Sequence, residues 1–220
     1  RPAVIATLPR SDGGQVVILD LGANVDCKPS HLAQFSVMGR VFAEDVLGID
    51  NPRVGILSNG EEEGKGNEQV RASIPVLSEM PIQFVGPVEP ADALRGGCEV
   101  VVCDGFVGNV MLKSMEAAVE IASKVLREEI LRRPGAKLGV KLLTGAFQQY
   151  RNRTSAGAVG GAFLLGVKGM VLVGHGRADA RAVHAAIQRA HAAIHQDLIG
   201  HIGDAISGAL AAVDVIDAGS

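Results

Sequence analysis

The sequence has no tryptophan, one tyrosine and only three cysteines among its 220 residues. Cys27, Cys98 and Cys103 lack the spacing of metal ligands and cannot all form disulfides, so a reducing, cytoplasmic environment is predicted. An excess of basic residues is also missing, since the formal net charge is -3. Without such an excess we expect no general binding to nucleic acid.

Long apolar segments are absent as well. No run of about 18 apolar residues is free of glycine breaks, so we predict no membrane-spanning helix. The first residues show no signal-peptide pattern. The chain begins at Arg1 rather than Met, and residues 1–6 read as the middle of a longer sequence. We therefore expect an amino-terminal part to be missing.

Short apolar runs alternate with longer segments of helical periodicity. Apolar runs of four or five residues are typical of strands buried on both faces. The predicted fold is therefore α/β, with a parallel-dominated sheet covered by helices on both faces, in a single domain over 1–220. The predicted strands are 16–20, 54–57, 82–85, 100–103 and 170–173, and the predicted helices are 31–47, 68–79, 110–131, 136–150 and 178–220.

Three predicted strands run into loops that contain Gly and Asn, and a helix follows each loop. These loops are 22–30, 59–67 and 104–109. In open parallel sheets, ligands bind beyond the carboxyl ends of the strands, where helix N-termini present N–H groups to anions. Each loop alone is typical of an ordinary turn or cap, but three at one edge favour an anion site.

The second loop has the glycines and lysine of a phosphate cradle, but its spacing differs from a nucleotide P-loop. Gly60 and Gly64 enclose three residues instead of four, and Gly66 rather than Ser or Thr follows Lys65. An ATP or GTP site is therefore not expected. The alternative is an acidic surface loop in which Asn67 caps a helix and Glu68 lies in its first turn. That alternative leaves the single lysine between two glycines unexplained.

Signatures of covalent catalysis are missing too. The sequence has no Gly-x-Ser-x-Gly elbow and no Gly-x-Gly-x-x-Gly fingerprint after a strand. The remaining polar groups suit the binding of a small anion and the stabilisation of charge in a direct displacement. They comprise the cations Lys28 and Lys65, the amides Asn24, Asn67 and Asn109, and the carboxylates Asp26, Glu68 and Asp104.

The histidines are weaker candidates. His175 follows the last predicted strand and is a candidate to face the site. The remaining candidates lie in or near the carboxyl-terminal helix, where a solvated or capping role is expected. They are His184, His191, His195 and His201.

A basic segment follows the fourth predicted strand and its helix. No Asp or Glu occurs between Ile130 and Ala178, and Lys137 and Lys141 flank apolar residues at helical spacing, which predicts a basic helical lobe at about 130–156. A basic amphipathic helix can lie on an anionic membrane or bind an acidic protein. A dimer-packing helix with a solvated basic face is an equal alternative.

Several motifs resemble the phosphate acyltransferase family of bacterial phospholipid synthesis. The matching segments are 19–29, 52–57, 65–68, 104–110 and 157–166, in the family's order over nearly the whole chain. The resemblance implies a homodimer with a fold like that of isopropylmalate dehydrogenases and phosphate acetyltransferases. It also implies that inorganic phosphate attacks the thioester of acyl carrier protein, giving acyl phosphate without a metal or organic cofactor.

The same resemblance assigns roles to the loop residues. Lys65 and Asn109 are the expected catalytic residues, which would hold phosphate or stabilise the oxyanion. The basic segment would bind the acidic carrier protein or the inner face of the membrane, near the acyl-phosphate:glycerol-3-phosphate acyltransferase that uses the product. The expected substrate-binding residues are Asn24, Asp26, Lys28, Gly66, Asn67, Glu68, Asp104, Gly105 and Gly108.

The sequence departs from the family pattern before Arg1. Family members usually carry Asp-Ala-Met-Gly-Gly-Asp and Ser-Ala-Gly-Asn-Thr-Gly motifs ahead of the matched region, and neither occurs here. Three alternatives therefore stay open. They are a phosphate acetyltransferase-like enzyme using acyl-coenzyme A, a non-catalytic dimer that binds carrier protein or membrane, and a nicotinamide-dependent dehydrogenase of the same fold group.

Overall fold

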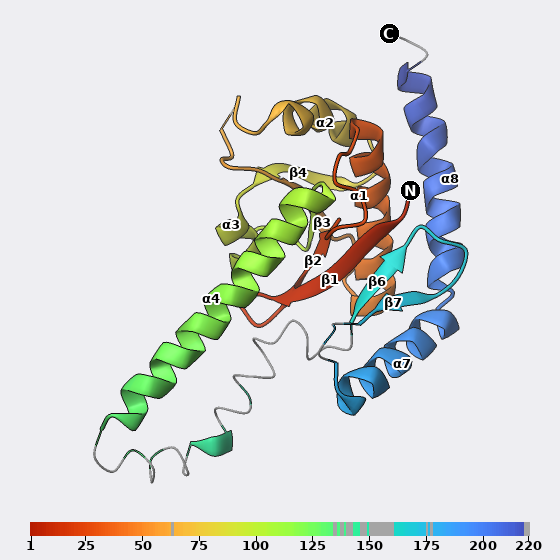
Figure 1. The fold of residues 1–220 in the computed structure, drawn as a ribbon. Helices are drawn as coiled ribbons and strands as arrows, with labels where there is room; N and C mark the ends of the chain where they lie inside the picture. The colour runs from red at the N-terminus through yellow and green to blue at the C-terminus, as the bar shows by residue number, and fades with distance from the viewer. Residues whose placement is uncertain are drawn as a thin grey trace.

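The computed structural model describes residues 1–62, 64–133, 136, 139, 143–145, 149, 161–174, 176 and 178–217, with the backbone alone for 210–217. These residues form a seven-stranded sheet with helices packed around it (Figure 1). The strands are β1 (Ala3–Pro9), β2 (Gln15–Leu19), β3 (Arg53–Leu57), β4 (Gln83–Val88), β5 (Val100–Val102), β6 (Ala162–Leu165) and β7 (Val171–Val173). The helices are α1 (Pro29–Leu47), α2 (Glu68–Ser78), α3 (Pro90–Arg95), α4 (Gly105–Leu131), α7 (Ala180–His195) and α8 (Leu198–Asp217).

The strand order is β4-β3-β5-β2-β1-β6-β7. The four strands from β4 to β2 are parallel, whereas β1, β6 and β7 each pair antiparallel to the strand before them in that order. Five of the seven strands consequently point in one direction. The predicted α/β class with a parallel-dominated sheet is confirmed.

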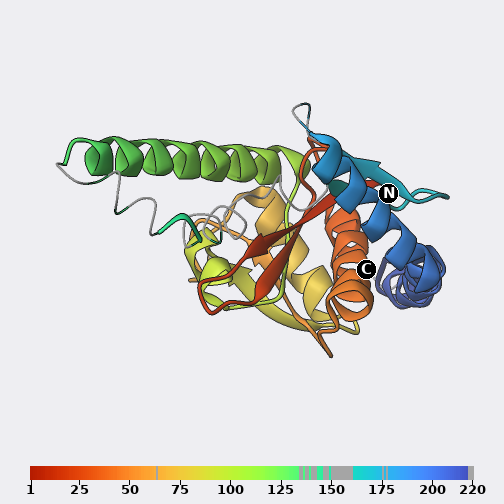
Figure 2. The ribbon, with the colours of Figure 1, turned by 90° about the horizontal axis from the view of Figure 1, so that it is seen from below.

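Helices cover both faces of the sheet because side chains alternate along the central strands. In β2, Val17 and Leu19 belong to a core shared with α1 and α8, whereas Val16 and Ile18 face a second core with α3 and the start of α4. Figure 2 shows the helices on the two sides. Beyond its first turns, α4 leaves the body, and Ile121 and Val125 are 62% and 52% exposed.

Several boundaries differ from the sequence-based prediction. The helix predicted at 110–131 begins earlier, at Gly105, because Asp104 caps it by accepting the Val107 N–H at 2.8 Å. The helix predicted from 178 to the end is two helices, since the chain turns at Asp197 with a φ of 52°. The strands β1 and β6 and the short α3 were not predicted. Most of the basic lobe at 130–156, including Lys137, Lys141 and the helix 136–150, lies outside the described residues.

None of the helices in the described part of the chain is long and apolar enough to cross a membrane.

The amino ends of the parallel strands are held together by one carboxylate. Glu99, just before β5, accepts hydrogen bonds from Arg10 Nη1 at 2.9 Å and Arg53 Nη2 at 2.7 Å. Its second oxygen accepts from the backbone N–H and the Nε of Arg53, both at 3.0 Å. Partial burial alone would raise the pKa of Glu99, but the hydrogen bonds from Arg53 and Arg10 lower it to about 2. This network links β1, β3 and β5 at the edge opposite their ligand-binding ends.

We expect Glu99→Gln to lower the free energy of unfolding at pH 7 by about 2 kcal/mol, because a neutral amide loses the charge-assisted hydrogen bonds. The pKa of Glu99 in the folded state lies below its ordinary value of 4.5. Its contribution is therefore complete above about pH 5 and is lost as the pH falls toward 2. Urea unfolding at pH 7 and at pH 3 should show a smaller difference between variant and parent at pH 3.

The matched control is Glu129→Gln, since Glu129 forms an exposed ion pair with Arg132 on α4. This control should change stability by less than about 0.5 kcal/mol. Equal effects of the two substitutions would contradict the role assigned to Glu99.

Candidate functional site

The three predicted loops meet at one edge of the sheet. β3, β5 and β2 are neighbours and parallel, so the loops that follow their carboxyl ends lie side by side. We call residues 20–28, 58–69 and 104–109 the loop cluster. Its position is the ligand-binding position of open α/β sheets.

The first loop is organised by Asp20, whose side chain is fully buried. Asp20 Oδ1 accepts the Val4 N–H at 2.9 Å, which fixes the loop to β1. The same carboxylate accepts N–H groups of the residues that follow it, at 3.1 Å for Gly22, 3.0 Å for Ala23 and 2.7 Å for Asn24. Because a buried carboxylate is costly without partners, these bonds stabilise one loop conformation. Asp20 was not among the predicted site residues, although its place at the end of a buried apolar run was a signal for it.

The start of α4 packs directly onto this loop. Gly105 N–H donates to the Asn24 carbonyl at 2.7 Å. A Cβ at Gly108 would overlap the Asp20 carbonyl oxygen, and a Cβ at Gly105 would lie 2.6 Å from the Asn24 carbonyl. The two predicted glycines thus allow a close approach of helix and loop. The Asn109 side chain lies beside Gly22, since its Cγ is 3.8 Å from the Cβ position of that glycine.

The loop after β3 has its own internal support. Asn59 Oδ1 accepts the Gly66 N–H at 2.8 Å, and Asn67 Oδ1 accepts the Val70 N–H at 2.9 Å. The predicted capping of α2 by Asn67, with Glu68 in the first turn, is therefore confirmed. Gln69 Nε2 donates to the Cys27 carbonyl at 2.7 Å, so this loop is tied to the one after β2.

The predicted polar residues divide into two groups. Asn24 donates its amide to the Pro2 carbonyl at 2.6 Å and to Asp20 Oδ2 at 2.9 Å, so its side chain holds the loop. Asp104 and Asn67 cap helices. In contrast, the side chains of Lys65 and Asn109 are exposed and have no hydrogen-bond or ion-pair partner within the described ranges. A cation and an amide are thereby left available to a ligand, and the other exposed predicted residues are Asp26, Lys28 and Glu68.

Ser58 is a further polar residue of the loop cluster, and sequence reasoning missed it. Its side chain is 8% exposed, and Oγ has no hydrogen-bond partner in the described structure. The hydroxyl lies at the carboxyl end of β3, 3.5 Å from the Cβ position of Gly66. A buried hydroxyl is normally paired, so this one adds an unused donor beneath the lysine loop.

The cysteines do not provide a nucleophile. Burial, followed by the charges of Asp20 and Asp104, raises the pKa of Cys27 to about 11. Burial also raises the pKa of Cys103, which is 4% exposed. Since the thiolate is the reactive form, these side chains stay protonated near neutral pH.

Among the described histidines, His31 lies beside the loop cluster, where its Nδ1 accepts the Lys28 N–H at 3.2 Å and burial lowers its pKa. The histidines of α7 and α8 lie away from the cluster. His201 Nδ1 is 2.8 Å from Asp45 Oδ2, and this hydrogen bond raises the pKa of His201. His191 and His195 are neighbours on α7, with Nε2 atoms 3.1 Å apart. His175 is outside the described residues. Among those described, no group of three or more His, Cys, Asp or Glu side chains could hold a metal ion.

We expect Asp20→Asn to lower the free energy of unfolding by about 3 kcal/mol, because an amide cannot accept all the N–H groups that converge on the carboxylate. Urea unfolding measures this change. The control is Asp26→Asn in the same loop, whose exposed carboxylate has no partner within the described ranges and should contribute less than about 0.5 kcal/mol. A loss for Asp20→Asn no larger than that of the control would refute the organising role of Asp20.

Comparisons with known proteins agree on one family. Residues 1–201 match the family model described as "Fatty acid synthesis protein". The phosphate acyltransferase of Desulforudis audaxviator is 45% identical over 206 residues, which are 94% of this chain and 61% of that protein. The phosphate acyltransferase of Aquifex aeolicus is 46% identical over 197 residues, or 90% and 58% of the two chains. The chain thus spans about three-fifths of the length of these relatives.

A solved structure supports the fold. The branched-chain phosphotransacylase from Enterococcus faecalis V583 aligns with a TM-score of 0.53 and 16% identity, covering 88% of this chain and 65% of that one. At this level of identity the likeness concerns the fold alone.

Proposed function

The chain belongs to the fatty acid synthesis protein family, whose model matches residues 1–201, and on that premise we propose that it transfers a fatty acyl group from acyl carrier protein to inorganic phosphate. The acyl phosphate would serve phospholipid synthesis. The relatives named phosphate acyltransferase support this reaction. In the structure, the proposal is supported by the exposed Lys65 and Asn109 side chains, which have no partner within the described ranges, and by cysteines that burial keeps protonated near neutral pH.

The proposed chemistry is a direct displacement. A phosphate oxygen attacks the thioester carbonyl carbon, and the carbonyl oxygen becomes an oxyanion. The C–S bond then breaks, and the carrier-protein thiolate leaves and takes up a proton. Phosphate is already an anionic nucleophile near neutral pH, so the protein has to bind it, orient it and stabilise the new charge. No metal or organic cofactor enters this scheme.

Lys65 and Asn109 are the proposed catalytic residues, which hold phosphate or stabilise the oxyanion. Exposed Asp26, Lys28 and Glu68 are proposed to orient the substrates around them. Asn24, Asn67 and Asp104 are proposed to position the loops, because their side chains form hydrogen bonds with backbone groups of other residues. Gly66, Gly105 and Gly108 contribute by allowing the loops to approach one another.

The proposed assembly is a homodimer. The part of α4 that leaves the body carries exposed apolar side chains, with Ile121, Val125 and Leu126 exposed by 62%, 52% and 49%. Exposed apolar groups clustered on one helix are typical of a protein interface. We propose that residues 1–220 form a single catalytic domain. In the proposed dimer, α4 of this domain contacts a second copy of the chain.

The basic segment is proposed to meet acyl carrier protein, because its cations complement an acidic partner. Peripheral contact with the cytoplasmic face of the membrane is a second proposed use, close to the membrane acyltransferase that would consume the acyl phosphate. Both uses concern residues largely outside those described. They predict association that weakens as salt is raised.

We expect Lys65→Ala and Asn109→Ala each to lower turnover at least about a hundredfold, because each would remove stabilisation of a charged transition state. The assay follows acyl phosphate and released carrier-protein thiol from long-chain acyl carrier protein and phosphate. Acyl-coenzyme A in place of the carrier protein distinguishes a phosphate acetyltransferase-like enzyme.

The control is Lys113→Ala, one helical turn beyond Asn109, where Lys113 is 58% exposed and pairs with Glu116. This variant should keep parent turnover. Near-parent turnover in both site variants would reject the assigned roles, and no product from the parent with either thioester would reject the proposed function.

A further inference from the structure

A cavity of about 270 Å³ lies between α1, α8 and the β6–β7 turn. Ile5 pairs with Leu19 and Ala3 with Leu165, so the ends of β2 and β6 lie at the same edge of the sheet. The cavity thus opens at the edge that carries the loop cluster. Its volume is close to the lower limit of about 300 Å³ for small-molecule sites.

The walls of this cavity are mainly aliphatic, and its polar groups lie near the rim. Arg1 and Lys168 bring positive charge to the rim, and Gln34 brings an amide. Gly166, with a φ of 76°, lets the turn close against residue 1 and α1, since a Cβ there would overlap the Arg1 carbonyl oxygen and lie 3.0 Å from Met38 Cε. The apolar side chains include Met38, Leu165, Met170, Ile199, Ile202 and Ile206.

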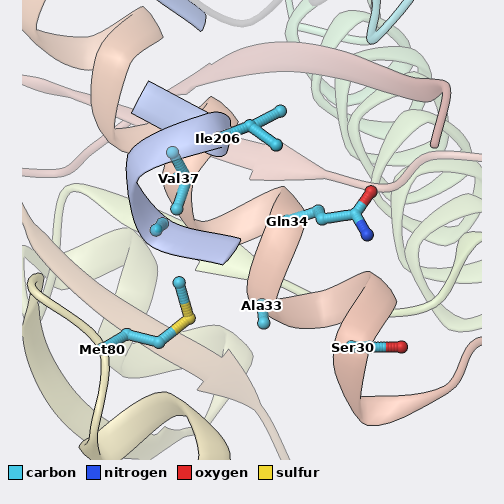
Figure 3. A pocket seen from close by; sticks show the side chains of 7 residues that line it. Ser30, Ala33, Gln34, Val37, Met80 and Ile206 are labelled. Atoms are coloured by element: carbon cyan, nitrogen blue, oxygen red, sulfur yellow. The ribbon is translucent and has the colours of Figure 1, made fainter. Parts of the chain in front are cut away.

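A narrower groove of about 10 Å³ continues from this cavity toward the start of α1. The two share Gln34 and Ile206, so they are adjacent, and we call them together the channel; nearly all of its open volume lies in the cavity. Figure 3 shows side chains of α1 and α8, together with Met80, around the narrow part. Along α8 the lining runs from Ile199 to Ala209, a length of roughly 15 Å at the helical rise.

Residues that line the channel are connected to the loop cluster by the chain itself and by hydrogen bonds. Ser30 lines the narrow part and lies two residues after Lys28 of the first loop. Arg1 lines the cavity, and the carbonyl of the next residue, Pro2, accepts from the Asn24 amide at 2.6 Å. Residues 1 and 2 therefore bridge the channel and the loop that Asp20 holds.

We propose that this channel binds the hydrocarbon chain of the fatty acyl substrate, with the thioester end at the loop cluster. An aliphatic channel matches a flexible apolar chain, and the positive rim matches the anionic phosphate of the acyl phosphate product. This inference rests on the proposed function, because the reaction places the acyl carbonyl at the loops.

Gly203→Leu on α8 tests the channel. Gly203 lines the cavity, and a Cβ there meets no atom within 4 Å, so a leucine has room to enter without distorting the helix. The matched control is Gly208→Leu on the same helix, where a Cβ also meets nothing within 4 Å and which does not line the cavity. Both substitutions replace glycine by a better helix former, so unfolding is not expected.

The first measurement is the binding of cis-parinaric acid, a fluorescent long-chain fatty acid. We expect Gly203→Leu to weaken binding at least tenfold and Gly208→Leu to leave it unchanged. No binding by the parent chain, or equal binding by both variants, would overturn the channel. Loss of binding after fusing the amino-terminal part of a longer relative before Arg1 would overturn it too, because a polypeptide segment would then fill the space.

The second measurement compares turnover of long-chain and butyryl acyl carrier protein. The channel predicts that Gly203→Leu lowers turnover of the long chain at least tenfold relative to butyryl, with no such change in the control. An unchanged chain preference, in a protein that makes acyl phosphate, would overturn the channel alone. Absence of acyl phosphate with specific fatty-acid binding would instead reject the proposed reaction.

Discussion

Five N–H groups converge on the buried carboxylate of Asp20 at the end of β2. They come from β1, from the loop itself and from the Asn24 side chain, so one residue ties the antiparallel and parallel halves of the sheet together. In the same loop, the Asn24 carbonyl accepts a hydrogen bond from the Gly105 N–H at the start of α4. The loop packs so closely against α4 that no Cβ fits at Gly105 or Gly108. The place of Asn109 beside Gly22 follows from this packing.

The two edges of the sheet use charge differently. At the amino ends of the strands, Glu99 is paired with two arginines, and all of its hydrogen-bonding capacity serves to hold strands together. At the carboxyl ends, Asp20 holds the backbone, whereas Lys65, Asn109 and the hydroxyl of Ser58 are left without described partners. Unpaired polar groups on a rigid frame are what a binding site needs, because they are satisfied only when a ligand arrives.

Sequence reasoning found the parallel strands because each is a short apolar run, such as 100–103, buried on both faces. It also placed the three loops at one edge, since strand direction fixes where parallel strands end. It missed β1 and β6, although each forms a hairpin with the next strand, β2 or β7, and Asp12-Gly13 between β1 and β2 is a hairpin signal. Only the pairing of β1 with β6 joins strands that are distant in sequence. It missed Asp20 and Ser58 because their importance lies in burial and hydrogen-bond geometry. Asn24 looked like a ligand donor, and only the structure shows its amide engaged by Pro2 and Asp20.

The loop cluster and the channel lie at the same edge of the sheet, so one substrate could occupy both. The loops would hold the reacting phosphate and carbonyl, while the space between α1 and α8 would hold the apolar remainder of the acyl group. Binding energy from a remote chain can then position the reacting atoms. The central claim is that the three loops bind one anion together.

The most direct test is a titration with inorganic phosphate, followed by NMR of the backbone amides. The account predicts that amides in 22–24, 65–69 and 105–109 shift together, with one common dissociation constant. Shifts confined to a single loop, or the absence of shifts in all three, would contradict it.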